Sequence, residues 1–282
     1  MTDLMDQKET TTVRPPGEPA APAPPPTART RRVPPAALSV AAFLVLLGAW
    51  WTSTATGWVD RIFLPGPDAV LARLADLSAG GELWEDLGVS VYRVGVGFAL
   101  ATLAALPLGI LMGRFPLWAA CVEPVVDFIR YMPVVAFVPL TILWAGTDDG
   151  QKFLIIVIGT FFQQVLLFTD NVRRTPRELV DVGRTLGLGH ARILRRIVLR
   201  ASAPALWDSL RVSLGWAWTW LVVAELVAAT SGLGYRITLA QRYLSTETII
   251  GYLLVLGLVG LVTDQLLRRA GRLLFRPAEL RA

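Results

Sequence analysis

Six apolar segments, each close to the length of a membrane-spanning helix, set the main constraint on how this sequence can fold. They run approximately over residues 36–55, 89–112, 119–145, 153–169, 206–229 and 248–267. A helix needs about 20 predominantly apolar residues to cross the hydrocarbon core of a bilayer. Only 17% of the residues are charged, whereas soluble domains carry about 25%. The sequence therefore predicts an all-α membrane protein with six transmembrane helices.

Three prolines, Pro107, Pro133 and Pro139, lie inside these segments. In a membrane bundle, neighbouring helices can satisfy the carbonyl groups that a proline frees, so we expect kinks at these positions. The third segment is too long for one straight span, and we expect its first turns to lie at the membrane interface.

Residues 1–35 form a proline-rich leader that precedes the membrane domain, residues 36–282. Such a composition cannot bury enough apolar surface to fold, which predicts a disordered cytoplasmic tail. We interpret the first apolar segment as an uncleaved anchor. A cleaved signal peptide is the alternative, because residues 53–55 loosely resemble a cleavage site.

The distribution of basic residues supports a cytoplasmic position for both termini. With six spans and the N-terminus inside, 20 of the 27 lysines and arginines fall in cytoplasmic segments, five in external segments and two within spans. This bias agrees with the positive-inside rule. The predicted location is therefore a cell membrane, crossed several times by the chain.

A polar, arginine-rich stretch lies between two spans, at about residues 171–205. Thr175, Pro176 and Glu178 read as a capping box that starts a helix. An apolar stripe follows at helical spacing, made of Leu179, Val182 and Leu186.

The same stretch then turns and continues as a second helix. Gly187 and Gly189 predict the turn, because glycine readily adopts the positive φ that ends a helix. The second helix starts near His190, and Pro204 marks the return to the membrane. The simplest interpretation is a solvated hairpin that retains the loop inside the cell. A DNA-reading helix-turn-helix is disfavoured, because the tether between two spans hinders access to a DNA groove. A docking element for a soluble partner is the third interpretation.

The spacing in this stretch resembles the cytoplasmic motif of permeases in ATP-binding-cassette (ABC) importers. That motif is Glu-Ala-Ala, three residues, Gly, nine residues, Ile, one residue and Leu-Pro. Asp181 begins the matching triplet, and Arg200 replaces the final proline. The residues that would couple the chain to an ATPase are Asp181, Val182, Gly183, Leu186, Gly187, Ile197 and Leu199.

Other segments resemble the nitrate/sulfonate/taurine branch of these importers. They are residues 64–67, 133–146, 222–225 and 231–234. The resemblance implies a type I importer permease fold with a cytoplasmic coupling helix-turn-helix, located in the inner membrane of a bacterial cell. It also implies two permease copies, two ATPase subunits and a solute-binding protein, with a nitrate-, sulfonate- or taurine-like anion as the transported solute.

The chain is not expected to be an enzyme. It contains no Gly-x-x-x-x-Gly-Lys-Ser/Thr phosphate-binding loop, and its lysines are Lys8 in the tail and Lys152, expected in an external turn. One histidine, His190, and one cysteine, Cys121, provide no catalytic or metal-binding set. We therefore expect no cofactor on this chain, ATP and Mg²⁺ on the partner subunit, lipid around the spans, and no nucleic acid.

Polar side chains within the spans are costly and suggest function or pairing. Arg130, Gln163 and Glu225 are the candidates for a translocation pathway, and Arg130 could attract an oxyanion. Structural pairing is the alternative for Arg130, and Glu225 is expected to pair with an arginine or a helix end. Arg93 and Asp264 are expected to pair across helices or to snorkel to the membrane interface.

Two functions from other classes remain open at this stage. An ion-coupled secondary transporter would use Glu225 and Asp264 as ion sites, although the sequence contains no convincing internal repeat. A membrane scaffold without a transport role is the second.

Overall fold

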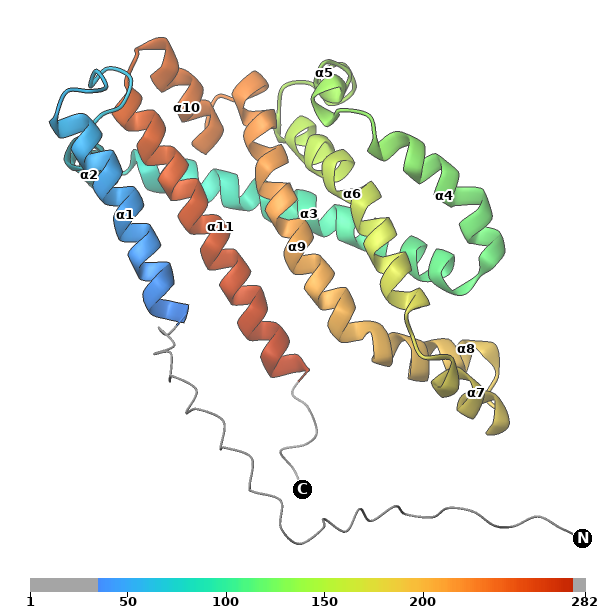
Figure 1. Ribbon diagram of the computed structural model, residues 1–282. Coiled ribbons are helices and arrows are strands. Elements are labelled where there is room, and N and C mark those ends of the chain that lie inside the picture. The colour runs from blue at the N-terminus through green and yellow to red at the C-terminus, as the bar shows by residue number, and fades with distance from the viewer. Residues whose placement is uncertain (1–34, 276–282) are drawn as a thin grey trace, which may run out of the picture. The chain divides into compact units, whose positions relative to one another are not determined.

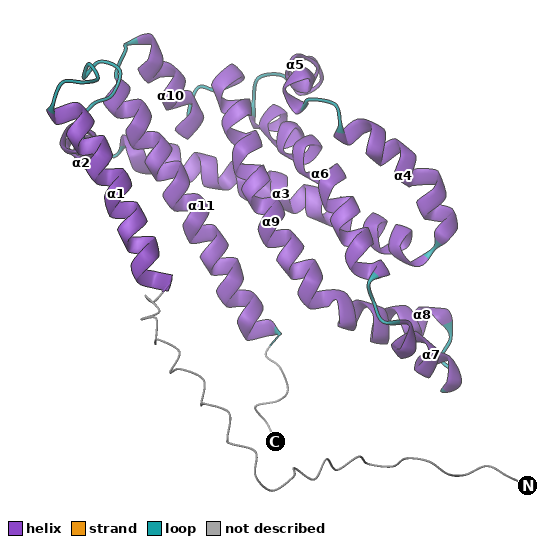
Figure 2. Cartoon of the chain, in the orientation of Figure 1, coloured by secondary structure: helices purple, strands orange, loops and turns teal. Residues whose placement is uncertain are grey.

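A computed structural model describes residues 35–275, and every regular element within them is helical (Figures 1 and 2). Apart from Pro35, the predicted tail lies outside the described residues. The elements are α1 (Pro35–Ala55), α2 (Pro67–Ala79), α3 (Glu82–Arg114), α4 (Pro116–Arg130), η1 (Val134–Phe137), α5 (Val138–Ala145), α6 (Asp149–Arg173), α7 (Arg177–Thr185), α8 (His190–Ile193), η2 (Leu194–Val198), α9 (Leu199–Ala228), α10 (Leu233–Arg242) and α11 (Thr246–Leu274).

Within residues 35–275, four helices are long and apolar enough to cross a membrane: α3, α6, α11 and the continuous helix His190–Ala228. The pair α4 and α5 makes a fifth span if its two halves are counted together. The first part of α1, up to Leu47, belongs to a compact unit of its own. Its large apolar side chains are exposed, from Leu38 to Leu47. The all-helical membrane fold is confirmed, while the count of six spans stays a prediction.

The third predicted span is broken rather than straight. Its two halves, Pro116–Arg130 and Val134–Ala145, meet at 89°. The bend predicted at Pro133 is confirmed. It arises because the residue before a proline is disfavoured in helical geometry. Pro139 instead lies in the first turn of α5, where its missing N–H is not needed. Pro107 lies inside α3, which continues to Arg114.

A stripe of small residues brings α3 against α6. Its members recur at every fourth position of α3: Gly97, Ala101, Ala105, Gly109 and Gly113. A Cβ atom on Gly109 would lie 2.6 Å from the Cβ of Phe168, and one on Gly113 would lie 2.6 Å from the Cβ of Val172. The two backbones therefore approach closely and run in the same direction, as small-residue interfaces allow in membranes.

Helices α9 and α11 complete the packing around this pair. Residues near the start of α6 meet the end of α9, and the Nζ of Lys152 donates to the carbonyl of Ala228. Helix α6 is therefore antiparallel to α9. Helices α9 and α11 are antiparallel as well, because Trp207, in the first half of α9, donates its indole N–H to the carbonyl of Leu267, near the end of α11 (2.8 Å). We refer below to the α7 end of the bundle, where α3 and α6 finish, and to the α10 end, where they begin.

We expect Gly109→Ala to lower stability by about 1–3 kcal/mol, because the added methyl group overpacks the α3–α6 interface. Gly95→Ala is the matched control, since Gly95 is on the same helix and a Cβ there meets no atom within 4 Å. It should be neutral or slightly stabilising, as alanine favours helices. Thermal unfolding of the purified proteins in detergent measures both, and equal unfolding temperatures would contradict this account of the interface.

Candidate functional site

At the α7 end, helix α7 finishes in a tight glycine turn. Gly187 has φ +70°, the N–H of Leu188 donates to the carbonyl of Gly183 (3.0 Å), and the N–H of Gly187 donates to that of Arg184 (2.9 Å). These two hydrogen bonds form a Schellman motif. The predicted turn and the second helix starting at His190 are confirmed.

The start of α7 differs from the prediction. The helix begins at Arg177, Pro176 is its extended N-cap residue, and no side chain caps it. The N–H of Thr175 donates to the carbonyl of Val172 (3.2 Å), in the turn that ends α6. The capping box from Thr175 to Glu178 is therefore wrong, because Thr175 belongs to that turn and lies too early to cap α7.

The second helix of the hairpin has no break before the membrane. Helices α8, η2 and α9 form one run, His190–Ala228, with a π-helical segment at Leu194–Val198. Pro204, predicted to mark the return to the membrane, lies inside α9. A helix in a bundle tolerates an internal proline where other groups satisfy the freed carbonyl.

One face of α7 is buried against this continuous helix. Gly183 is buried, and a Cβ atom there would lie 2.5 Å from Cδ1 of Ile197 and 3.3 Å from Cγ1 of Ile193. A small residue therefore fits best at this position: alanine, as in the importer motif, would only need the terminal methyl group of Ile197 to move, whereas a larger side chain would need more space. Val172, at the end of α6, belongs to the same apolar cluster as Ile193.

The adjacent face of α7 exposes the apolar stripe. The exposed fractions are 44% for Leu179, 56% for Val182 and 72% for Leu186. Asp181 is also exposed and pairs with Arg184 (3.0 Å). Leu199 is half-buried at the start of α9. The hairpin thus packs one apolar face inward and presents another outward.

Two of the three predicted pathway residues share a cavity. Arg130 of α4 and Gln163 of α6 both line a cavity of about 570 Å³, together with Trp216 of α9. The guanidinium of Arg130 pairs with Asp127 (2.9 Å) and lies 4.6 Å from the ring centre of Tyr131. Arg130 is the one cation among the lining residues of this cavity, and three carboxylates line it as well: Glu123, Asp127 and Asp170.

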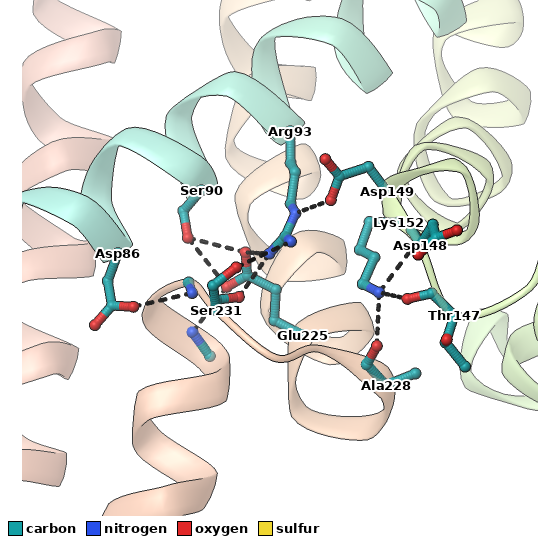
Figure 3. A network of polar contacts seen from close by, with 12 residues as sticks. Asp86, Ser90, Arg93, Thr147, Asp148, Asp149, Lys152, Glu225, Ala228 and Ser231 are labelled. Carbon is teal, nitrogen blue, oxygen red and sulfur yellow. Dashed lines mark hydrogen bonds and ion pairs between the residues drawn. The ribbon is translucent and has the colours of Figure 1, made fainter.

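The third, Glu225, lies in a buried network at the α10 end (Figure 3). Its carboxylate is paired with Arg93 of α3, whose Nη1 donates to Oε1 (2.9 Å). Arg93 also donates from Nε to Asp149 of α6 (2.7 Å) and from Nη1 to the carbonyl of Ser231 (2.7 Å). The cross-helix pairing expected for Arg93 and Glu225 is confirmed.

Side chains from α3 and α9 also cap the start of α10. Three consecutive N–H groups donate to them: Gly232 to Asp86 (3.0 Å), Leu233 to Ser90 (2.9 Å) and Gly234 to Glu225 (2.8 Å). Gly232 has φ +109°, and a Cβ there would collide with the carboxylate of Glu225. These contacts satisfy N–H groups that a helix start leaves free.

Lys152 donates hydrogen bonds to backbone carbonyl groups, including the last one of α9. Its ammonium group donates to the carbonyl of Ala228 (2.6 Å), to that of Asp148 (3.2 Å) and to that of Thr147 (Figure 3). Lys152 is 1% exposed and lies inside α6, so its predicted position in a turn is wrong. The reason is that α6 begins at Asp149, earlier than the predicted span, which places Lys152 in the first turn of the helix.

Sequence reasoning missed several members of this network. Asp86 and Ser90 lie four residues apart and precede Arg93 on one face of α3. Asp86 also accepts hydrogen bonds from Arg236 (2.8 Å) and from the hydroxyl of Tyr252 (2.9 Å). The spacing of Asp86, Ser90 and Arg93 could have indicated a polar face on one helix. The predicted span began only at residue 89 and therefore left Asp86 outside it.

Comparison with known proteins gives consistent relatives. The family model described as "binding-protein-dependent transport system inner membrane component" matches residues 105–276. A probable ABC transporter permease protein of Brucella melitensis is 39% identical over 235 residues, which make up 83% of this chain and 94% of that protein.

Two further relatives carry substrate names. The taurine transport system permease protein TauC of Escherichia coli is 29% identical, over 83% of this chain and 87% of its own. A putative aliphatic sulfonates transport permease protein SsuC of Bacillus subtilis is 32% identical, over 82% of this chain and 84% of its own.

Among solved structures, an inward-facing MetNI methionine ABC transporter has a similar fold. The TM-score is 0.59 at 19% identity, over 66% of this chain and 93% of that one. The helical fold, the apolar spans and the family match agree. The chain belongs to the family of inner-membrane components of binding-protein-dependent transport systems, as a permease subunit of an ABC importer.

Proposed function

We propose that this permease carries a small sulfonate-type anion into the cytoplasm, driven by separate ATPase subunits that dock on α7. The relatives named for taurine and aliphatic sulfonates support the solute class, because both names describe sulfonates. Nitrate remains a further candidate from the branch that the sequence resembles. A binding protein would deliver the solute at the α10 end.

The exposed apolar stripe of α7 is the observation that carries the docking proposal. Leu179, Val182 and Leu186 are exposed on a short helix that is otherwise rich in charged residues. Exposed apolar residues with a polar rim are typical of a protein interaction site, and an amphipathic helix commonly binds in an apolar groove. The coupling residues are then Asp181, Val182 and Leu186 at the contact, with Gly183, Gly187, Ile197 and Leu199 holding α7 in place.

The proposed assembly contains two permease copies and two ATPase subunits, with ATP and Mg²⁺ bound by the ATPase subunits. Six spans with both termini in the cytoplasm would place α7 on the same side as ATP. Docking changes the relative energies of inward- and outward-open states when nucleotide binds, and such a difference is sufficient to shift their populations. Lipid surrounds the spans, and no contact with nucleic acid is proposed.

For the pathway, we propose that Arg130 and Gln163 face the solute. Their shared cavity supports this assignment, and Arg130 supplies the one cation of its lining, beside three carboxylates. Glu225 would act indirectly, since its carboxylate already accepts hydrogen bonds from Arg93, Ser90 and the N–H of Gly234.

An ion-coupled transporter receives no support. The carboxylate of Glu225 is already held by its hydrogen bonds within the buried network. Asp264 accepts a hydrogen bond from Arg211 (2.5 Å) and pairs with Arg268 (3.6 Å). The family relationship also favours the importer over a membrane scaffold without transport.

We expect Gly183→Val to reduce coupling between ATP hydrolysis and uptake, because the added side chain pushes α7 away from Ile197. Gly189→Val is the matched control, since Gly189 has an ordinary negative φ and a Cβ added there would meet no atom within 4 Å. Uptake per ATP hydrolysed, measured on the reconstituted importer, should fall about tenfold in the first variant and stay near wild type in the second. The same uptake per ATP hydrolysed in both variants would contradict a coupling role for α7.

We expect Arg130→Gln to lower sulfonate uptake about tenfold, because it removes a cation from the cavity. Asp127→Asn breaks the same ion pair but leaves the positive charge, so uptake should be unchanged or faster. The initial rate of taurine uptake into proteoliposomes measures both. If the two variants lose uptake equally, the ion pair has only a structural role.

A further inference from the structure

The cavity at the α7 end is distinguished by the charge of its walls. It measures about 860 Å³ and lies between the last turns of α3 and α6, the first residues of α4, and α7. Its lining includes four arginines, Arg114, Arg173, Arg177 and Arg184, and one carboxylate, that of Asp181. The excess of cations makes the cavity a site of positive potential.

Two of the four guanidinium groups are already neutralised. Arg173 pairs with Glu123 (2.8 Å), and Arg184 pairs with Asp181 (3.0 Å). Arg114 and Arg177 form no ion pair with any residue between 35 and 275. These two cations come from different helices and line the same cavity. Arginine is well suited to bind an oxyanion there, because its planar N–H groups match the geometry of phosphate.

Further hydrogen-bond donors lie in the same wall. Thr175 lines the cavity, and its buried hydroxyl has no hydrogen-bond partner among the described residues. The N-terminus of α7 begins at Arg177 and has no side-chain cap. The first N–H groups of a helix lack partners within it and favour an anion. Two unpaired cations, a buried hydroxyl and an uncapped helix start therefore converge on one cavity.

The surroundings of the cavity indicate where the anion comes from. Pro116 lines it, and the next two residues of α4 are exposed apolar side chains, Leu117 (81% exposed) and Trp118 (50%). Tryptophan is enriched where a membrane meets water. A small free anion would not use this apolar surface, whereas the acyl chains of a phospholipid would cover it.

We propose that this cavity binds the phosphate group of an anionic phospholipid. The phosphate contacts Arg114, Arg177 and the hydroxyl of Thr175, and the acyl chains lie along the first turns of α4. Basic pockets between membrane helices are suited to such headgroups. The site is separate from the solute cavity at Arg130 and does not depend on which solute is transported.

The experiment measures the dissociation constant of phosphatidylglycerol for the full-length chain by native mass spectrometry, with phosphatidylcholine as the neutral comparison. Arg114→Gln with Arg177→Gln should weaken phosphatidylglycerol binding about tenfold. Arg195→Gln with Arg200→Gln is the matched control, because it removes the same charge from exposed arginines that do not line the cavity. That control should stay within about twofold of wild type. Equal losses in the two double variants, or no loss in either, would overturn the proposal.

Thr175→Val tests the site without changing any charge. It should weaken phosphatidylglycerol binding about fivefold through one lost hydrogen bond. It should not destabilise the protein, because the hydroxyl has no partner among the described residues. If the arginine variant fails to fold, unchanged binding by Thr175→Val contradicts the proposal. Excess inorganic phosphate should not displace the lipid, and displacement by phosphate would show a site for a free anion instead.

Discussion

The close contact between α3 and α6 is the interaction on which the rest of the bundle depends. Lipid tails are as apolar as the helices, so helices associate in a membrane where their backbones can pack closely. The stripe from Gly97 to Gly113 provides that contact along α3. The same helix carries Arg93 to the network at the α10 end and Arg114 to the cavity at the α7 end. Both functional regions are therefore positioned by one interface.

At the α10 end, buried charges stabilise the ends of helices rather than leave an open binding site. Glu225 and Asp86 accept hydrogen bonds from the first N–H groups of α10, and Lys152 donates to the last carbonyl of α9. Unsatisfied backbone groups are expensive in a membrane, and these side chains remove that cost for a loop between two helices. The arrangement favours a structural role for Glu225.

The apolar segments and the turn at Gly187 were predictable, because hydropathy and glycine act locally. The network was not, because its contacts join residues far apart in sequence: Asp86 and Gly232 are 146 residues apart, and Lys152 and Ala228 are 76 apart. The small-residue stripe of α3 is visible in the sequence at a spacing of four, yet its partner helix is not. The capping box failed for a tertiary reason, since the turn that ends α6 holds Thr175.

The central claim is that the exposed face of α7 contacts an ATPase subunit and responds to its nucleotide. The most direct measurement is disulfide cross-linking from Val182→Cys, in a chain whose native Cys121 is replaced by serine, to single cysteines placed on the ATPase surface. We predict a cross-link to the ATPase whose yield changes when ATP binds. A Val182→Cys importer that still transports but forms no cross-link to any ATPase position would contradict the account.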